Sequence, residues 1–283
     1  MHERRAAPSS PTIAVALGGG GARGIAHIAV LEALDELGLK PVAVAGCSMG
    51  AIIGAAYAAG LTGAELRAPS LALLRKRSDV MGRLLKARVG RFTQLFTSLS
   101  NPVLIDAEIF LDLFWPDAVP DSFEELRLPM TVVATDFAAR KEAVFSAGPL
   151  APAVAGSMAI PGLIRPVLAE GRYLIDGGVV NPLPYEHLRG AADCIIAVDV
   201  AQGPAGQKRA TLSPFEAMSG SAQIMQAALT EQKIRLNPPD LLIRPAVTMF
   251  RALDFFRIVQ ILRAAESSKD EIKRGLEARL DVG

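Results

Sequence analysis

The sequence predicts an α/β protein of three layers (α/β/α), in which helices cover both faces of a mostly parallel central sheet. Two observations carry this prediction. Segments rich in β-branched residues alternate with helical patterns over the first 60 residues, and the later strand candidates are short, continuous and apolar, as in a sheet buried on both faces. The composition agrees, because 51% of the 283 residues are hydrophobic while only 5% are aromatic, which suits helices packed closely on a sheet.

The first elements expected along the chain are a strand at residues 12–17, a helix at 23–37, a strand at 41–45 and a helix at 49–59. Further strands are predicted at residues 129–135, 143–146, 173–175, 194–200 and 241–244. Two long helices, at residues 214–236 and 253–280, are expected to flank the last strand. We expect residues 1–11 to be a disordered tail and residues 12–283 to form a single domain.

Charge, cysteine and histidine content exclude several classes of protein. Thirty basic and 29 acidic side chains give a net charge of +1, whereas a nucleic-acid-binding protein carries a strong basic excess. Two cysteines and three histidines without ligand spacing predict free buried thiols, no metal site and no cofactor. The longest apolar stretch, residues 45–60, is shorter than the roughly 20 residues that span a bilayer. A cytoplasmic protein without a transmembrane segment is expected.

The near-zero total charge conceals one basic segment. Residues 67–105 hold eight Lys or Arg and one Asp, a net charge of +7, so the rest of the chain carries −6. Apolar side chains are interleaved with these charges, a pattern able to approach anionic lipid. A solvated helical face followed by a loop explains the same pattern. A subunit contact would also suit these apolar residues, so the oligomeric state is left open.

A glycine-rich turn follows the first strand and opens the first helix. Its residues are Gly18, Gly19, Gly20, Gly21, Ala22, Arg23 and Gly24. Backbone N–H groups in such a turn converge on an anion at the helix amino terminus. Gly19, Gly21 and Gly24 fit a dinucleotide-binding fingerprint, but the second strand lacks the carboxylate that would hold the ribose. The alternative use of the turn is an oxyanion hole for a tetrahedral intermediate.

The second strand leads into a candidate nucleophile. Gly46-Cys47-Ser48-Met49-Gly50 matches G-x-S-x-G between a strand and a helix, the nucleophile elbow that exposes a serine hydroxyl. A tight turn with a capping serine would give the same pentapeptide. Its position one βα unit after the glycine-rich turn favours a catalytic role for Ser48.

The serine needs a base, and two candidates exist. The order Ser48, Asp176, His187 matches an α/β-hydrolase triad, although His187 follows Asp176 by only eleven residues and lies in an expected helix start. Asp176-Gly177-Gly178 follows a strand, and glycines let a carboxylate approach another loop closely. An ordinary Asp-Gly hairpin turn explains this tripeptide as well. His27, one turn inside the first helix, is expected to pack or to cap.

In order and spacing, these motifs closely resemble the patatin-like phospholipase family. The resemblance rests on the glycine-rich turn at residues 19–24, the elbow at 46–50 and Asp176-Gly177-Gly178. Residues 156–162 also look like the family's proline-containing block, and the similarity extends from about residue 13 to residue 200. Two positions depart from the family pattern. Cys47 stands where the family usually has Thr, and Gly18 stands where many members carry Asp.

The resemblance implies a Ser-Asp dyad, in which Ser48 attacks an ester carbonyl and Asp176 is the general base. It also implies that N–H groups of residues 19–24 hold the oxyanion, while Arg23 anchors the loop or contacts the substrate. The substrates implied are acyl esters of phospholipids, lysophospholipids or neutral glycerolipids, without a cofactor. Residues 67–105 would be a lid or a peripheral contact with an anionic membrane. A regulatory or adaptor protein that retains the fold and a nucleotide-binding module are the alternatives.

Overall fold

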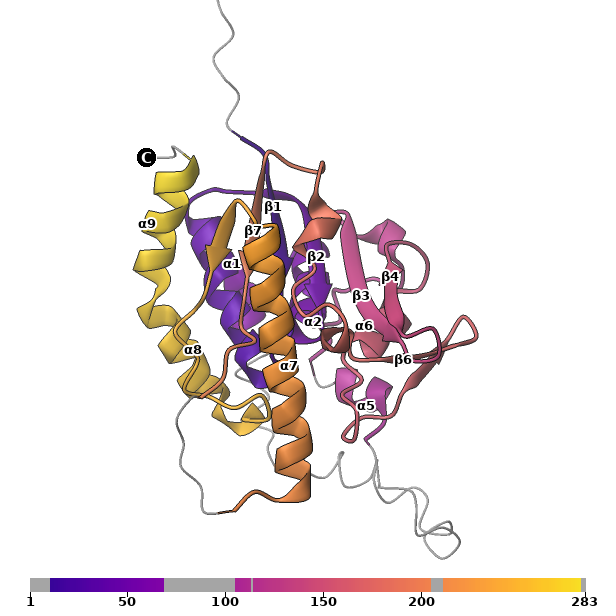
Figure 1. Cartoon of the computed structure of the whole chain (residues 1–283). Coiled ribbons are helices and arrows are strands. Elements are labelled where there is room, and N and C mark those ends of the chain that lie inside the picture. Colours follow the sequence, from indigo (N-terminus) through magenta and orange to yellow (C-terminus); the bar gives the residue numbers. More distant parts are fainter. Residues whose placement is uncertain (1–10, 69–104, 113, 205–210, 281–283) are drawn as a thin grey trace, which may run out of the picture.

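The computed structural model describes residues 11–68, 105–112, 114–204 and 211–280. A sheet of eight strands lies between two helical layers, with α7 in front of it and α1 and α2 behind it (Figure 1). The predicted three-layer α/β fold is therefore confirmed. Residues 1–10 of the predicted tail at 1–11, and residues 69–104 of the predicted lid at 67–105, lie outside the described residues.

Strands and helices alternate along the chain as expected. The strands are β1 (Ile13–Leu17), β2 (Pro41–Cys47), β3 (Met130–Asp136), β4 (Lys141–Phe145), β5 (Val167–Ala169), β6 (Arg172–Ile175), β7 (Cys194–Val198) and β8 (Leu241–Ile243). The α-helices are α1 (His27–Glu36), α2 (Met49–Ala58), α5 (Ala107–Leu111), α6 (Leu150–Ser157), α7 (Pro214–Leu236), α8 (Ile258–Ser267) and α9 (Lys269–Leu280). The 3-10 helices are η1 (Gly21–Ala26), η3 (Phe123–Glu125), η4 (Gly177–Val179), η5 (Tyr185–Leu188) and η6 (Phe255–Arg257).

Five neighbouring strands form the parallel part of the sheet, in the order β3-β2-β1-β7-β8. β4, β5 and β6 add antiparallel pairings beside β3. Because parallel strands end at the same edge of a sheet, the loops that follow β1, β2 and β3 gather there. None of the helices in the described part of the chain is long and apolar enough to cross a bilayer.

Alternate residues of β1 face the two helical layers. Ile13, Val15 and Leu17 belong to the larger core, which α1, α2 and α8 cover. Ala14 and Ala16 belong to a smaller core with η5 and α7. The methyl side chains on this second face let η5 lie close to the strands.

β3 brings the ends of two other strands together. β4 pairs with residues 132–136 of β3, so β2 and β6 must both use the opposite edge of that strand. Cys47 of β2 pairs with Val133, and Ile175 of β6 pairs with Thr135, two residues further along. Since β2 runs parallel and β6 antiparallel to β3, the two strands point at each other end to end. The residues that follow them therefore meet.

The structure differs from the predicted elements near both ends of the chain and in its middle. The helix expected at residues 253–280 is divided into η6, α8 and α9. The hydroxyls of Ser267 and Ser268 donate to the carbonyls of Ala264 and Ala265, which competes with continuation of the helix. The helix expected from residue 23 begins instead as the 3-10 turn η1. Neither α6, which contains a proline and a glycine, nor the three-residue β5 was predicted.

Candidate active site

Ser48 occupies the tight turn between β2 and α2. Its φ of 52° and ψ of −123° are rare for a non-glycine residue, a conformation that costs about 1–3 kcal/mol and recurs at active sites. Sterics require both flanking glycines. A Cβ on Gly46 would lie 2.6 Å from Ala51 Cα, and one on Gly50 would lie 2.1 Å from Leu17 O. The strand, turn and helix that G-x-S-x-G predicts are all present.

The Asp176 carboxylate lies against Ser48. Ser48 Oγ donates to Asp176 Oδ2 at 2.8 Å, and Gly178 N donates to Asp176 Oδ1 at 2.7 Å. Both Ser48 and Asp176 are buried, with 4% and 5% of their surface exposed. Burial raises the pKa of Asp176 to about 6, against the lowering effect of the two hydrogen bonds. The carboxylate is thus ionised at neutral pH and still able to accept a proton.

Ser157, at the end of α6, supports this pair, and the motifs in the sequence assigned no role to this residue. It is fully buried, accepts a hydrogen bond from Ser48 N at 2.8 Å and donates to Val133 O at 2.6 Å. A Cβ on Gly177 would lie 2.1 Å from the same Val133 O, so glycine lets the Asp176 turn approach β3. The resemblance at residues 156–162 is the one sequence signal that pointed to this region.

The glycine-rich turn lies beside the same pair. Gly19 N and Ala22 N donate to backbone carbonyls at 2.8 and 2.7 Å, so both amides are already used. The N–H groups of Gly20 and Gly21 have no acceptor anywhere in the described ranges. Among residues 19–22, these two amides are therefore free to donate to a ligand.

Two buried basic side chains anchor the turn. The Arg23 guanidinium donates to Ala201 O at 3.0 Å, and burial lowers the pKa of Arg23 to about 10, so it stays charged at neutral pH. His27 Nε2 donates to Gly18 O at 2.8 Å, and burial lowers the pKa of His27 to about 4, which keeps the ring neutral. A Cβ on Gly21 would lie 2.2 Å from Ala252 O, so the loop after β8 packs on this turn.

A pocket opens beside Ser48, and most of its walls are apolar. Residues 19–21, Ser48 and Asp176 line it together with side chains from α7. Its further lining residues include Ile160, Leu163, Val179, Met218, Ala222 and Leu253. Apolar walls with a few convergent polar groups are typical of ligand sites. The sequence predicted no substrate-binding residues, because α7 carries no motif and only the fold brings it to Ser48.

His187 does not lie between Ser48 and Asp176, as a triad would require. Its Nε2 pairs with Glu142 Oε2 at 2.8 Å, a contact that raises the pKa of His187. Glu142, Glu186 and His187 are the one group in the described part of the chain whose ligand atoms lie close enough to share a metal ion. The Lys233 ammonium already occupies the side of Glu186, which disfavours a second cation there.

The basic segment predicted at residues 67–105 is described only at its ends. Of its charged residues, Arg67 alone is described, and its guanidinium donates to both oxygens of Glu32 at 2.6 Å. Arg67 also pairs with Glu266. Its charge is neutralised within the fold, so Arg67 does not belong to a lipid-facing surface. The lid and the membrane contact stay predictions.

Fold and site together define a class of protein: a three-layer α/β fold with a serine on a strand–helix elbow, a carboxylate bonded to that serine and a glycine-rich turn beside both. The patatin-like phospholipase family matches residues 15–189, and the chain belongs to this family. The resemblance predicted from the three motifs is confirmed.

Several relatives are similar over about two thirds of the chain. An NTE family protein of Mycobacterium tuberculosis (strain H37Rv) is 41% identical over 204 residues, 71% of this chain and 52% of the relative. Human patatin-like phospholipase domain-containing protein 6 is 35% identical over 201 residues, 67% of this chain and 13% of the human protein. The chain thus spans about half the length of its mycobacterial relative. The crystal structure of VipD from Legionella pneumophila aligns with 15% identity and a TM-score of 0.49, over 95% of this chain and 67% of VipD.

Proposed function

We propose that this protein is a serine acyl hydrolase that cleaves carboxylic ester bonds of phospholipids, lysophospholipids or other acyl lipids. One observation carries the proposal: Ser48 Oγ lies 2.8 Å from Asp176 Oδ2, on an elbow turn beside an apolar pocket. A hydroxyl bonded directly to a partly desolvated carboxylate pairs a nucleophile with its base and needs no histidine between them. Membership of the patatin-like phospholipase family supports the same chemistry.

In the first half-reaction, Asp176 accepts the proton of Ser48 Oγ as that oxygen attacks the ester carbonyl carbon. The carbonyl oxygen becomes an oxyanion and accepts hydrogen bonds from the amides of Gly20 and Gly21. The proton on Asp176 then passes to the oxygen of the leaving alcohol as its bond to the acyl carbon breaks. The acyl group stays on Ser48.

In the second half-reaction, Asp176 takes a proton from a water molecule that attacks the acyl carbon. The tetrahedral intermediate again places its oxyanion against the glycine-rich turn. As the bond to Ser48 Oγ breaks, the proton returns from Asp176 to Ser48, and the fatty acid leaves. The two half-reactions balance with Ser48, Asp176 and water.

The pocket supports an acyl substrate better than a nucleotide. The glycine-rich turn shares the pocket with Asp176, whose ionised carboxylate at neutral pH would repel a phosphate placed there. The apolar lining suits an acyl chain. One relative, the lysophospholipase nte1 of Aspergillus fumigatus, is 34% identical over 196 residues, 66% of this chain and 12% of that protein, and its name favours lysophospholipids among the possible substrates.

The test combines hydrolysis and labelling. Purified protein should hydrolyse a short-chain nitrophenyl ester and a lysophospholipid, and an organophosphonate probe should attach to Ser48. Ser48→Ala should lower kcat/KM at least about a thousandfold, because it removes the nucleophile. His187→Ala is the matched control and should keep most activity, since His187 pairs with Glu142.

Each other outcome points to an alternative. Activity that survives Ser48→Ala removes the mechanism. A folded wild-type protein that hydrolyses neither ester and takes up no probe is a regulatory or adaptor protein. His187→Ala as inactive as Ser48→Ala would restore the triad.

A further inference from the structure

Helix α7 exposes large apolar side chains and directs polar ones toward the protein. Met218, Ile224, Met225 and Leu229 are 53%, 71%, 60% and 44% exposed, and we call these four residues the α7 outer face. Their spacing places them on one side of the helix. The less exposed positions of α7 include Ser219, Gln223, Gln226, Thr230 and Lys233. A surface helix of a soluble protein has the opposite arrangement, so the α7 outer face indicates an apolar partner.

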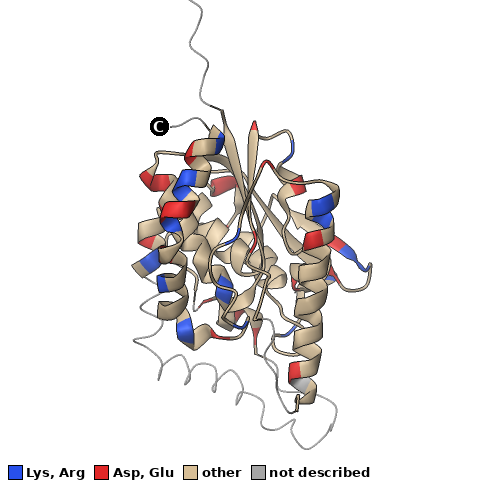
Figure 2. Cartoon of the chain, turned by 60° about the vertical axis from the view of Figure 1, so that its left-hand side comes forward, with Lys and Arg blue, Asp and Glu red and all other residues tan. Residues whose placement is uncertain are grey.

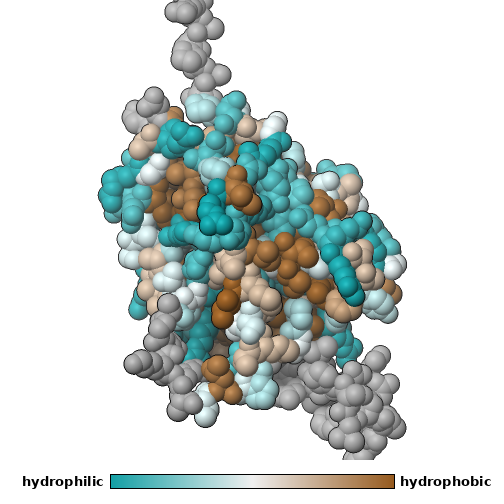
Figure 3. All heavy atoms as spheres, viewed as in Figure 1, coloured by the Kyte–Doolittle hydropathy of each residue, from teal (hydrophilic) through white to brown (hydrophobic). Residues whose placement is uncertain are grey.

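The α7 outer face also lacks charge. No Lys, Arg, Asp or Glu occurs between Glu216 and Glu231, and Figure 2 shows α7 tan over this stretch while the helices on the other side of the sheet carry many charges. Figure 3 shows hydrophobic surface on α7 and directly beside it. Because no ion has to be desolvated, this surface can enter an apolar medium at low cost.

The α7 outer face adjoins the pocket at Ser48. Met218 belongs to both, and a shallow groove along α7 that Met225 and Leu229 line shares Val179, Ala222 and Gln226 with the pocket. A Cβ on Gly178 would lie 2.7 Å from Gln226 Nε2, so α7 packs directly on the turn that follows Asp176. Apolar surface thus continues from the exposed side of α7 to the candidate nucleophile.

We propose that the α7 outer face docks on a lipid–water interface, the surface of a micelle or bilayer of acyl lipids, and admits a lipid from that surface to Ser48. This inference rests on the acyl-hydrolase function proposed above. A helix that lies in such an interface buries its apolar face about 5–10 Å into the boundary between headgroups and acyl chains. Because the face is uncharged, binding should depend on apolar insertion and should not require anionic lipid.

A second copy of the chain is the rival partner for the same face. A dimer through Met225 and Leu229 would cover the groove that continues into the pocket, and would close the route by which a lipid reaches Ser48. A lipid surface instead supplies the substrate along that route. The continuity of face and pocket therefore favours lipid.

The test uses Ile224→Glu/Met225→Glu, whose side chains are exposed and do not line the pocket at Ser48. Flotation with phosphatidylcholine vesicles measures docking, and hydrolysis of micellar lysophospholipid is compared with hydrolysis of a monomeric nitrophenyl butyrate. The double variant should bind vesicles at least about tenfold less tightly, because two charges must enter the interface. The rate at which it hydrolyses micellar lysophospholipid should fall by a similar factor. kcat/KM for the soluble ester should stay unchanged.

Leu236→Glu is the matched control. Leu236 is 80% exposed and is the last residue of α7, at the end of the helix away from Met218. It lies between Arg235 and Asn237, and the Asn237 carbonyl accepts a hydrogen bond from Tyr185. This variant should bind vesicles and hydrolyse micelles as the wild type does.

Unchanged vesicle binding by the double variant overturns the inference, as does an equal loss on the soluble ester. A wild-type dimer that the double variant converts to a monomer in sedimentation, without a loss of vesicle binding, assigns the face to a second copy. Vesicle binding that requires anionic lipid and persists in the double variant places docking elsewhere. A wild-type protein that binds vesicles through α7 but hydrolyses neither substrate overturns the proposed function and leaves the docking surface standing.

Discussion

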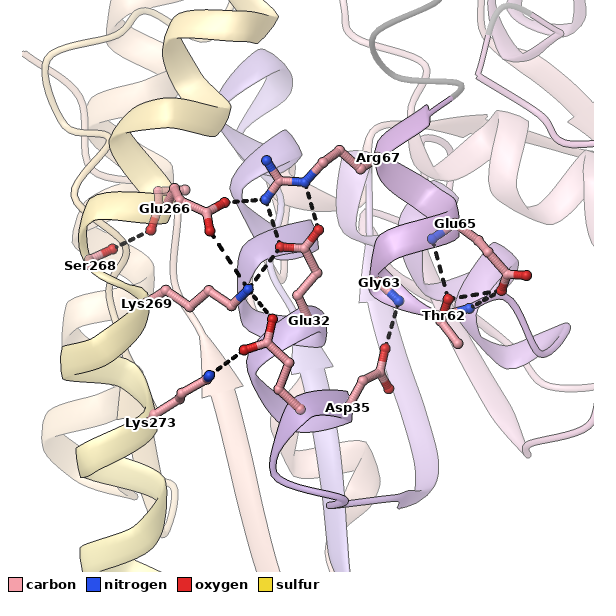
Figure 4. Close-up of polar contacts among 12 residues, drawn as sticks. Glu32, Asp35, Thr62, Gly63, Glu65, Arg67, Glu266, Ser268, Lys269 and Lys273 are labelled. Carbon is pink, nitrogen blue, oxygen red and sulfur yellow. Dashed lines mark hydrogen bonds and ion pairs between the residues drawn. The ribbon is translucent and has the colours of Figure 1, made fainter.

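The two helical layers that cover the sheet use charge in opposite ways. Behind the sheet, Glu32 of α1 accepts hydrogen bonds from Arg67 and Lys269, and Glu266 and Lys273 extend the same ion-pair network along α8 and α9 (Figure 4). In front of the sheet, α7 has no charge over four turns and presents the α7 outer face to solvent. Polar contacts therefore hold one layer to the rest of the fold, while the other layer exposes apolar surface next to the candidate active site.

The two regions also respond to pH with opposite signs. Burial acts to raise the pKa of Glu32, but Arg67 and Lys269 prevail and hold it below its usual 4.5. The stability from this carboxylate is present above pH 4.5 and is lost as the pH falls further. Burial raises the pKa of Asp176 from 3.8 to about 6, so stability linked to that group is present below pH 3.8 and is lost as the pH rises through 6. Acid therefore lowers the stability that the ion-pair network provides, whereas ionisation of Asp176 near neutral pH lowers the stability of the active site.

The largest expected effect comes from Asp176→Asn. The amide cannot accept the Ser48 proton, so activity should fall at least about a thousandfold. The same change removes a buried charge, so at pH 8 the free energy of unfolding should rise by as much as about 3 kcal/mol. Urea denaturation at pH 8 and pH 4 measures this gain, which should nearly disappear at the lower pH.

The pH dependence of the wild type tests the same assignment. kcat/KM for a soluble ester should rise as the pH passes through about 6, because the ionised form of Asp176 is the base. A rate that is flat from pH 5 to pH 8, or an Asp176→Asn protein less stable than the wild type at pH 8, would break the contrast between a strained site and a stabilising network.

Ser157→Ala should have the next largest effect. It leaves Ser48 N and Val133 O without their buried partner, which costs about 1–3 kcal/mol of stability. Displacement of the elbow should also lower kcat about 10- to 100-fold, with KM for a soluble ester nearly unchanged. Ser221→Ala is the control, because Ser221 is exposed on α7 and does not line the pocket at Ser48, and it should change neither quantity. A Ser157→Ala protein that loses stability alone would make Ser157 a packing residue without a positioning role.

The sequence predicted the parts of the molecule in which backbone geometry demands particular residues. Gly46 and Gly50 are needed because a side chain would collide with neighbouring backbone, and the same close packing makes G-x-S-x-G recognisable. Asp176 was found through its glycines for a similar reason. The parallel core was predicted because strands buried on both faces must be continuously apolar.

Apart from the Ser48–Asp176 pair, which the family resemblance implied, contacts between distant segments were not predicted. Ser157 acts through one hydroxyl, and serine is too common for its position to indicate a partner 109 residues away. The pocket lining and the exposed apolar side of α7 were missed because the helix carries no motif. Only the tertiary structure shows which of its sides faces the pocket and which faces solvent. Arg67 was counted with the basic segment at residues 67–105 because the sequence does not reveal that Glu32 neutralises it.

Glu32→Gln tests the stabilising layer and should have a moderate effect. Loss of the charge leaves Arg67 and Lys269 without their buried partner, and the free energy of unfolding should fall by about 1–3 kcal/mol at pH 7. Hydrolysis of a soluble ester at 25 °C should be unchanged, because the network lies on the other side of the sheet from α7. A drop in kcat/KM as large as the one expected for Ser157→Ala would show that the two layers are not independent.

Lys273→Ala should have the smallest effect and marks the outer limit of the network. Its partner Glu36 is 43% exposed, so water and salt screen the pair, and the loss of stability should not exceed about 0.5 kcal/mol. A double-mutant cycle with Glu36→Gln in low salt and in 0.5 M salt measures the coupling directly. Coupling well above 1 kcal/mol that persists in high salt would mean that exposed pairs also stabilise this layer. The contrast with α7 would then lie in the number of ion pairs and not in the burial of Glu32.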